Sequence, residues 1–257
     1  YRNETRTYPR RASFRAGGDL SFFQDFFVKF YQAFIEGDRW LQYLNGVKTT
    51  LLVTALALIL GIVLGVLVAM LRTAHDQQRP GHRNPILAVL NLICKVYVTV
   101  IRGTPMMVQL LIMGFVIFAS SRNFTMIGTL TLGINSGAYV SEIVRGGLMS
   151  VDKGQMEAGR SLGLNYMTTM RFIVIPQAVK AILPALGNEF IILLKDTSLI
   201  TVIGGKELLY AAQGIYNRTY EQMFPLIGTA ALYLVLVIIL SWLLGKLERR
   251  LRQSDRR

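Results

Sequence analysis

Cysteine and histidine are nearly absent from this chain, which has one Cys and two His in 257 residues. Cys94 alone can form no intrachain disulfide, no Cys-rich metal site and no CxxC redox pair. His75 and His82 lie together in one polar linker. The sequence therefore predicts neither a metal site nor redox chemistry.

Catalytic motifs are also missing. No GxxxxGK[ST] phosphate loop occurs, and the stretch IGGKEL around Lys206 has the wrong spacing for one. The sequence contains no HExxH, no Gly-x-Ser-x-Gly and no recognisable Ser, His and Asp set. We therefore expect no catalytic residues and no cofactor on this chain, and we do not expect an enzyme.

Charge is scarce and apolar residues are abundant, at 17% charged and 52% hydrophobic residues. A helix needs about 20 apolar residues to cross a bilayer core of about 30 Å, and residues 47–71 exceed that length. The sequence predicts an all-α membrane protein with about five spans, at 46–71, 97–119, 124–147, 176–197 and 223–245. Residues 86–96 are interrupted by polar side chains and are expected to form a lead-in helix rather than an extension of the second span.

The distribution of Lys and Arg predicts the orientation. Basic residues gather after the first span, between the third and fourth, and after the fifth, whereas the opposite loops contain few. The positive-inside rule then places the N-terminus outside and the C-terminus in the cytoplasm. Arginines from Arg2 to Arg15 oppose this orientation, but they lie beyond the roughly 15 to 20 residues from a span over which the rule is counted.

Three regions are expected. Residues 1–45 form an external basic segment that ends in an amphipathic helix, whose phenylalanines recur at helical period as in a membrane interface. Residues 46–245 form the transmembrane domain. Residues 246–257 form a basic cytoplasmic tail, which next to a span anchors the chain to anionic lipid. The net charge of +13 therefore indicates membrane lipid, not nucleic acid, as the partner.

Polar side chains inside spans are the first candidates for function, because they are costly to bury in a membrane. Asn135 and Ser136 in the third span, and Asn188 and Glu189 in the fourth, are expected near mid-depth, where they could form a shared polar site. The alternative is that they only form hydrogen bonds between helices.

Small residues at four-residue spacing predict close helix packing. They occur in the first and third spans, at Gly61 and Gly65 and at Gly133 and Gly137. Further along the third span, Glu142 is expected to reach cytoplasmic water or to pair with Arg145.

Four residues are candidate hinges or kinks. Within RGTP, Gly103 and Pro105 predict that a helix kinks or begins there, because proline lacks a backbone donor. Pro176 and Pro184 bracket the inner part of the fourth span in the same way.

The loop at residues 150–171 is unusually polar for its position between two apolar runs. Ser150 or Asp152 can cap a helix start, and Gly163 suits the left-handed residue that ends a helix. Glu157 falls in the early turns, where the helix dipole favours a carboxylate. The pattern predicts a short cytoplasmic helix parallel to the membrane.

One face of this helix is suited to a partner protein. Ala158 and Leu162 lie one turn apart with little bulk, while Glu157 and Arg160 offer charge, which fits docking into a groove. From these residues alone, a simple amphipathic connector is the favoured interpretation.

The stretch EAGRSLGLNYMTTMRFIVIP, from Glu157 to Pro176, resembles the EAA loop of permease subunits of ATP-binding cassette importers. RGTPMMVQLL, from Arg102, and GAYVSEIVRGGLMSVDKGQMEAG, from Gly137, resemble the branch of these permeases that imports polar amino acids. The resemblance covers residues 40–250.

Two positions depart from the motif. Gly159 stands where a second alanine is usual, and Ile175 replaces leucine. Because Gly weakens a helix by about 0.5 to 1 kcal/mol relative to Ala, docking would have to order this helix.

The resemblance implies a type I importer with two permease subunits, as a homodimer or a heterodimer, two ATPase subunits and an external solute-binding protein. ATP and Mg would bind to the separate ATPase, and the permease would be a multi-pass protein of a prokaryotic plasma membrane. The residues implied to couple to the ATPase are Glu157, Ala158, Gly159, Arg160, Leu162 and Gly163. Some relatives hold an amino acid midway in the membrane, and the candidates by position are Asn135, Ser136, Asn188 and Glu189.

A secondary amino acid carrier driven by an ion gradient is the alternative function. Such a carrier would be expected to show inverted repeats and interrupted helices at matching positions. The five predicted spans show no such symmetry.

Overall fold

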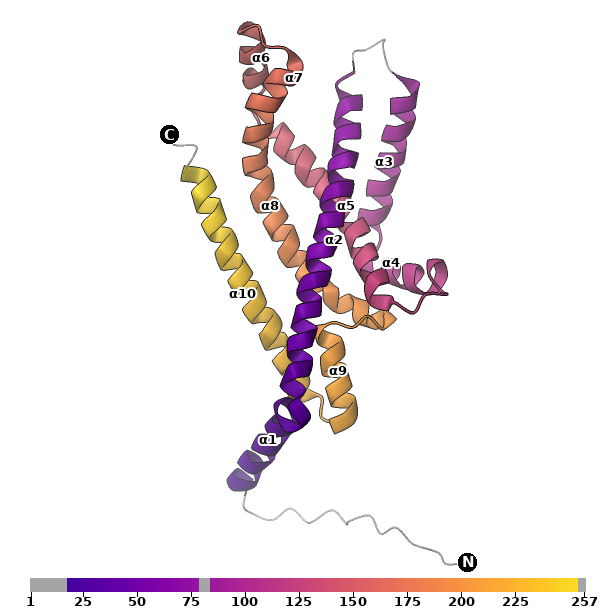
Figure 1. Cartoon of the computed structure of the whole chain (residues 1–257), viewed down its shortest axis with the longest axis vertical. Coiled ribbons are helices and arrows are strands. Elements are labelled where there is room, and N and C mark those ends of the chain that lie inside the picture. Colours follow the sequence, from indigo (N-terminus) through magenta and orange to yellow (C-terminus); the bar gives the residue numbers. More distant parts are fainter. Residues whose placement is uncertain (1–17, 79–83, 254–257) are drawn as a thin grey trace, which may run out of the picture.

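The computed structural model describes residues 18–78 and 84–253 (Figure 1). The arginines from Arg2 to Arg15 and the end of the basic tail, 254–257, lie outside the described residues. All regular elements within the described ranges are helical. The α-helices are α1 (Gly18–Phe34), α2 (Arg39–Asp76), α3 (Pro85–Gly103), α4 (Met106–Ile112), α5 (Phe124–Met149), α6 (Lys153–Ser161), α7 (Tyr166–Thr169), α8 (Ile175–Asp196), α9 (Leu208–Thr219) and α10 (Met223–Gln253). Shorter turns are η1 (Glu36–Asp38), η2 (Met113–Ile117), η3 (Met170–Val174) and η4 (Thr197–Ile203).

Long apolar helices dominate the described part of the chain. Four helical stretches there are long and apolar enough to cross a membrane, Glu36–Asp76, Pro85–Gly103, Tyr166–Ile203 and Met223–Leu251. Helix α5 takes the place of the third predicted span and is less apolar, because Gly, Ser and Thr recur along it. The predicted all-α bundle of about five spans is confirmed.

The second predicted span, 97–119, is wrong. Residues 86–96 are not a separate lead-in helix, because they lie within α3, which begins at Pro85 and ends at Gly103. Asn91, which seemed to interrupt the apolar run, is buried against α2, where its Nδ2 lies 3.0 Å from His75 Nδ1. The helix ends because Thr104 precedes Pro105 and is held in an extended conformation.

The helix that contains the fourth predicted span begins before residue 176. Helix α7, η3, α8 and η4 form one apolar helical stretch from Tyr166 to Ile203, so Pro176 lies inside this stretch and not at its start. Proline cannot donate a backbone hydrogen bond and crowds the preceding turn. The wide π turn of η3, in which the Ile175 N–H bonds to the Met170 carbonyl, accommodates that ring.

Helices α2 and α5 pack tightly and run in the same direction. A Cβ on Gly61 would lie 2.7 Å from Ser136 Oγ, and one on Gly65 would lie 2.6 Å from Val140 Cγ1. The second contact lies four residues after the first on each helix. The predicted close packing is therefore confirmed.

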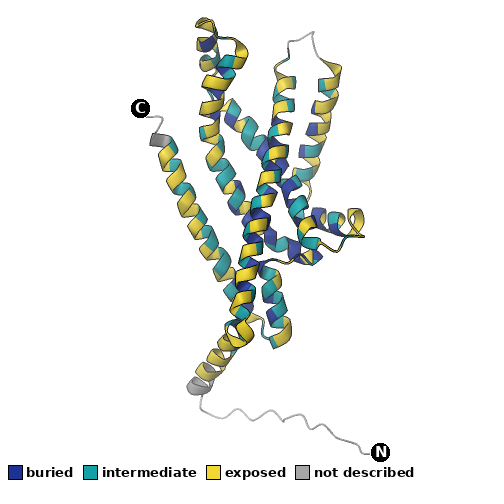
Figure 2. Ribbon diagram, viewed as in Figure 1, coloured by how far each residue is buried: buried dark blue, intermediate teal, exposed yellow. Residues whose placement is uncertain are grey.

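Buried residues gather where α2, α5 and α8 meet, whereas α1 and much of α3 and α10 expose apolar side chains (Figure 2). The central cluster includes Val53, Leu110, Leu132, Leu193 and Ile200. Apolar exposure of this extent is expected for a chain whose outer surface meets lipid or other subunits.

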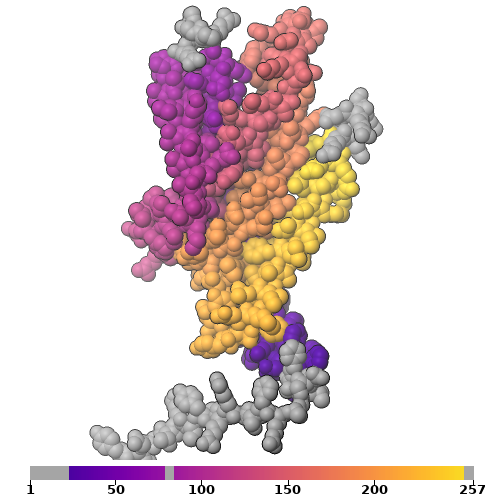
Figure 3. Space-filling view, turned by 180° about the vertical axis from the view of Figure 1, so that it is seen from behind, coloured from indigo at the N-terminus to yellow at the C-terminus, as the bar shows by residue number. Residues whose placement is uncertain are grey.

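The two ends of the bundle differ. Helices α6 and α7, the last turn of α2, the first turn of α3 and the last turns of α10 lie at one end, and α1 and α9 lie at the other (Figure 1). The space-filling view from behind shows α5 and α8 in the middle, with α3 along one edge and α10 along the other (Figure 3). The segments predicted to be cytoplasmic therefore share one end of the molecule.

Candidate functional site

The loop between α5 and α8 contains the predicted short helix. Asp152, rather than Ser150, caps α6, because its Oδ1 accepts a 2.6 Å hydrogen bond from the Gly154 N–H. Gly163 ends the turn with φ +78°, and the Leu164 N–H bonds back to the Gly159 carbonyl at 3.0 Å. The C-terminal geometry is the left-handed one that favours glycine.

Gly159 is buried where α6 meets α7. A Cβ at this position would lie 2.5 Å from Thr169 Cγ2 and 2.7 Å from its Oγ1. Thr169 is held in turn, because its hydroxyl donates to the Asn165 carbonyl at 3.0 Å. Gly159 is therefore a close-packing residue, and its effect on helix propensity is only part of its role.

The outer surface of this loop carries both charged and apolar side chains. Glu157, Ala158 and Arg160 are exposed, and Leu162 is 78% exposed and Met167 69% exposed. Apolar anchors ringed by charge are typical of protein-binding surfaces.

The loop is also attached to the bundle. A pocket of about 650 Å³ lies behind α6, lined by residues that include Met156, Glu157 and Val174. Across it, the Tyr166 hydroxyl donates to Gln77 Oε1 at 2.5 Å, which joins α7 to the end of α2. The loop is therefore attached to α2 as well as to α8.

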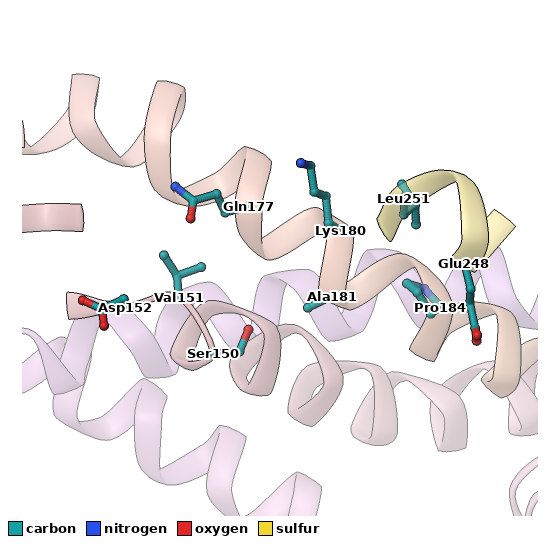
Figure 4. Close-up of a pocket in the computed structure, with 9 residues that line it drawn as sticks. All are labelled: Ser150, Val151, Asp152, Gln177, Lys180, Ala181, Pro184, Glu248 and Leu251. Carbon is teal, nitrogen blue, oxygen red and sulfur yellow. The ribbon is translucent and has the colours of Figure 1, made fainter. Parts of the chain in front are cut away.

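A second pocket, of about 420 Å³, lies between the α5–α6 connection, α8 and the end of α10 (Figure 4). Its lining includes Asp152, Gln177, Lys180 and Glu248. The pocket shows that these three segments meet here without close packing.

The four predicted path residues do not form a single cluster. Ser136 donates to Glu189 Oε1 at 2.8 Å, and both residues are buried between α5 and α8. Asn135 instead donates to Gln109 Oε1 at 2.9 Å, and Asn188 is exposed. The Ser136–Glu189 and Asn135–Gln109 bonds match the alternative interpretation, in which such residues join helices.

Gln109 is a structural residue that the sequence interpretation missed. Its Nε2 donates to the Ile101 carbonyl at 2.7 Å and to Thr104 Oγ1 at 2.8 Å. These acceptors lie where α3 ends, so Gln109 compensates for the helix break at Pro105 and ties it to α5 through Asn135. In the sequence, Gln109 could have been identified as a single Gln in an apolar run, four residues after a proline.

Glu142 was predicted to reach cytoplasmic water or to pair with Arg145, and the pair with Arg145 does not form. Glu142 forms an ion pair with Arg72 of α2, and Arg102 Nη1 of α3 lies 4.0 Å from its other oxygen. Arg145 pairs instead with Asp76 at 2.8 Å. The prediction considered only residues on one helix, whereas the parallel packing of α2 and α5 brings partners from a neighbouring helix closer.

Glu207 is a second residue that was missed. It is 1% exposed, caps α9 by accepting from the Tyr210 N–H at 2.8 Å, and accepts from the Tyr233 hydroxyl of α10 at 2.6 Å. Thr201 of η4 donates to the same carboxylate. Glu207 therefore joins three elements at the end of the bundle opposite α6.

Within residues 18–78 and 84–253, no group of His, Cys, Asp and Glu could hold a metal ion. A bundle of long apolar helices with a short, capped, polar helix exposed at one end is typical of a membrane protein that binds another protein at that end. The chain belongs to the family described as the binding-protein-dependent transport system inner membrane component, whose model matches residues 86–253.

Individual relatives agree with this family. The chain is 34% identical over 229 residues to the putative glutamine transport system permease protein GlnP of Rickettsia typhi, covering 88% of this chain and 97% of that protein. It is 39% identical over 171 residues to the glutamine transport system permease protein GlnP of Escherichia coli K12, covering 64% of this chain and 77% of that protein.

Solved structures give the same result. A crystal structure of an amino acid ABC transporter with histidines matches with 37% identity and a TM-score of 0.73, covering 90% of this chain and 97% of that one. An inward-facing MetNI methionine ABC transporter matches in fold, with 19% identity and a TM-score of 0.70. The resemblance to type I importer permeases is confirmed, and the alternative of a secondary carrier is not supported. The chain is a permease component of the membrane and not an enzyme.

Proposed function

We propose that this chain forms the translocation path of an ATP-driven importer of a polar amino acid. Its most similar relatives include glutamine permeases and an amino acid transporter of known structure, which supports this substrate class. ATP and Mg bind to a separate ATPase subunit, an external binding protein delivers the amino acid, and a second permease subunit completes the path.

The observation that carries the proposal is the continuity from α6 to the bundle. Gly159 lies within contact distance of Thr169, and from there α7, η3 and α8 form one helical stretch. Movement of an ATPase against Glu157, Arg160 and Leu162 would therefore tilt α8 rather than bend a loop. Because α8 packs on α5 through Glu189 and Ser136, its tilt alters the path.

The orientation is part of the proposal. The end that bears α6, the last turn of α2 and the last turns of α10 is cytoplasmic, which agrees with the positive-inside rule. Residues 246–257 are then a basic tail against the inner leaflet.

Helix α1 is proposed to lie in the outer interface. Its Phe26 ring packs on Phe224 of α10 with centroids 5.0 Å apart, and Lys29 bridges Asp25 and Glu221, each at 3.4 Å. The hydrogen bond that Lys29 donates to the Asp25 carboxylate raises the pKa of Lys29. Phe27 is 66% exposed, as expected for an aromatic residue at the headgroup level.

Replacement of Glu157 tests the coupling role. Glu157→Lys reverses the charge on the exposed face of α6, so we expect loss of ATPase co-purification and of ATP-driven uptake, with normal membrane insertion. The matched control is Gln222→Lys, an exposed position at the opposite end of the bundle, which should leave both unchanged. Normal ATPase binding and uptake in Glu157→Lys would refute the coupling role.

A further inference from the structure

An apolar groove lies between α2 and α10, near the end of the bundle that bears α1 (Figure 1). Its volume of about 340 Å³ is in the usual range for a ligand site. The residues that form its walls include Trp40, Tyr43 and Leu44 of α2 and Gly228, Ala231 and Val235 of α10. Trp40, Leu44 and Val235 are each about half exposed, so the groove opens on the outer surface of the bundle.

Small residues of α10 leave room for this groove. Gly228, Ala231 and Val235 recur at helical spacing and share one face of α10. Phe34 of α1 forms a third wall and packs closely on α10, because a Cβ on Gly228 would lie 2.5 Å from Phe34 Cε1. The Phe34 ring also packs on the Tyr43 ring, with centroids 5.5 Å apart. The walls of the groove are therefore fixed by packing between three helices.

One polar group in the walls of this groove has no partner. Tyr43 is 3% exposed, and within the described residues its hydroxyl is buried without a hydrogen bond. A buried hydroxyl without a partner destabilises the fold, whereas phenylalanine would form the same apolar wall at no such cost. The hydroxyl of Tyr43 therefore indicates that a ligand with an oxygen acceptor completes the groove.

Charged groups of both signs lie at the start of α2, next to the groove. Arg39 is one helical turn, about 6 Å, before Tyr43 and on the same side of α2. Its hydrogen bonds within the described residues, to the Gln32 carbonyl and to Glu36, both use Nη1, so Nε and Nη2 remain available to an anion. Asp38 is exposed, and its carboxylate makes no capping hydrogen bond to α2.

These features follow the order of the groups in a phospholipid. Residues 39–43 precede the predicted first span, 46–71, whereas Gly228 and Val235 fall within the fifth, 223–245. The groove therefore extends from headgroup depth towards the acyl region. Exposed Trp40 agrees with this depth, because Trp and Tyr are enriched where headgroups meet acyl chains. Arg39, the Tyr43 hydroxyl and the apolar walls then match a phosphate, an ester and an acyl chain in turn.

We propose that the groove binds one acyl chain of phosphatidylethanolamine, a zwitterionic phospholipid. The phosphate pairs with Arg39, an ester oxygen accepts from the Tyr43 hydroxyl, and the ammonium group pairs with Asp38. Charge of both signs favours this lipid over an anionic one, whose headgroup has no cation for Asp38 and Glu36. The site does not depend on which solute the importer carries, so uptake assays test the proposed function separately.

Filling the groove tests whether lipid occupies it. Native mass spectrometry of the purified importer complex, with its ATPase subunits, measures binding of dioleoylphosphatidylethanolamine. Ala231→Phe places a ring in the groove, so we expect saturable binding at this site to be lost. Ala230→Phe is the matched control, because Ala230 is also exposed but does not line the groove, and it should bind as the wild type does.

Unchanged lipid binding in Ala231→Phe would overturn the inference. If this variant also separates the permease subunits while its lipid binding is unchanged, a second copy of the chain occupies the groove instead.

Tyr43→Phe tests the hydroxyl with the loss of a single atom. We expect lipid binding to weaken by about fivefold, the factor for one lost hydrogen bond. In lipid-depleted detergent, the same variant should melt at or above the wild-type temperature, because it no longer buries a hydroxyl without a partner. Unchanged lipid affinity, or a lower melting temperature without lipid, would overturn the role of Tyr43 and the inference with it.

Asp38→Asn tests the choice of headgroup. Asp38 has φ +54°, a conformation that Asn also adopts, so this change should preserve the backbone. We expect the wild-type complex to bind phosphatidylethanolamine more tightly than phosphatidylglycerol with the same acyl chains, and Asp38→Asn to reduce this preference. Equal binding of the two lipids by the wild type, or an unchanged preference in Asp38→Asn, would overturn the inference.

Discussion

Replacement of Gly159 by Ala tests how α6 is attached to the bundle. The new Cβ would lie 2.5 Å from Thr169 Cγ2 and 2.7 Å from its Oγ1, where carbon atoms in contact are normally about 3.5 to 4.0 Å apart. Ala improves helix propensity by about 0.5 to 1 kcal/mol, whereas overpacking costs about 1 to 3 kcal/mol. We therefore expect a net loss of about 1 kcal/mol in the docking of α6 on α7.

Thr169→Ala provides the matched compensation. It removes both atoms that the new methyl group would meet, at the loss of one hydrogen bond to the Asn165 carbonyl. In a double-mutant cycle, we expect Gly159→Ala and Thr169→Ala to be less damaging together than the sum of the single changes, by about 1 kcal/mol.

Hydrogen exchange of the amides in residues 153–169 is the assay, because it reports local opening of α6 and α7. Faster exchange in Gly159→Ala, reversed in the double variant, is the expected result. Unchanged or slower exchange in Gly159→Ala would refute the reasoning and would mean that Thr169 yields freely.

Two further changes test the residues that the sequence did not identify. Gln109→Leu leaves the Ile101 carbonyl at the end of α3 without its donor, so we expect thermal stability in detergent to fall by about 1 to 3 kcal/mol, with unchanged stability contradicting this role. Glu207→Leu removes the acceptor of the Tyr233 hydroxyl and should destabilise by a similar amount, about 1 to 3 kcal/mol, whereas Glu207→Gln keeps an acceptor and should cost less. Equal melting temperatures for the Leu and Gln variants at position 207 would contradict the buried network.

Apolar length and glycine spacing predicted most of the fold. Residues 46–71 were identified as a span because they form a long apolar run whose one charged residue, Lys48, lies near its start. Gly61 and Gly65 were identified because small residues permit close packing. The second span was misplaced because an apolar run continues across Thr104 and Pro105, although the helix does not. Hydropathy depends on side chains alone, so it does not detect a helix end at proline, which lacks a backbone N–H.

The candidate site, like the fold, could be predicted from the sequence only in part. Capping and a left-handed glycine predicted α6, since both are local effects of Asp152 and Gly163. The contact between Gly159 and Thr169, and the pairing of Glu142 with Arg72, depend on how separate helices pack. Spacing along one helix carries no information on such contacts, so these partners could not be predicted from it.

This chain is proposed to transport an amino acid with energy from ATP that is bound to another subunit. The direct measurement is uptake of labelled glutamine into proteoliposomes that contain the chain, its ATPase subunit and the loaded binding protein. Uptake that requires ATP on the ATPase side and ceases without the ATPase subunit is the predicted result. Uptake driven by a proton or sodium gradient with no ATPase subunit present would contradict the account.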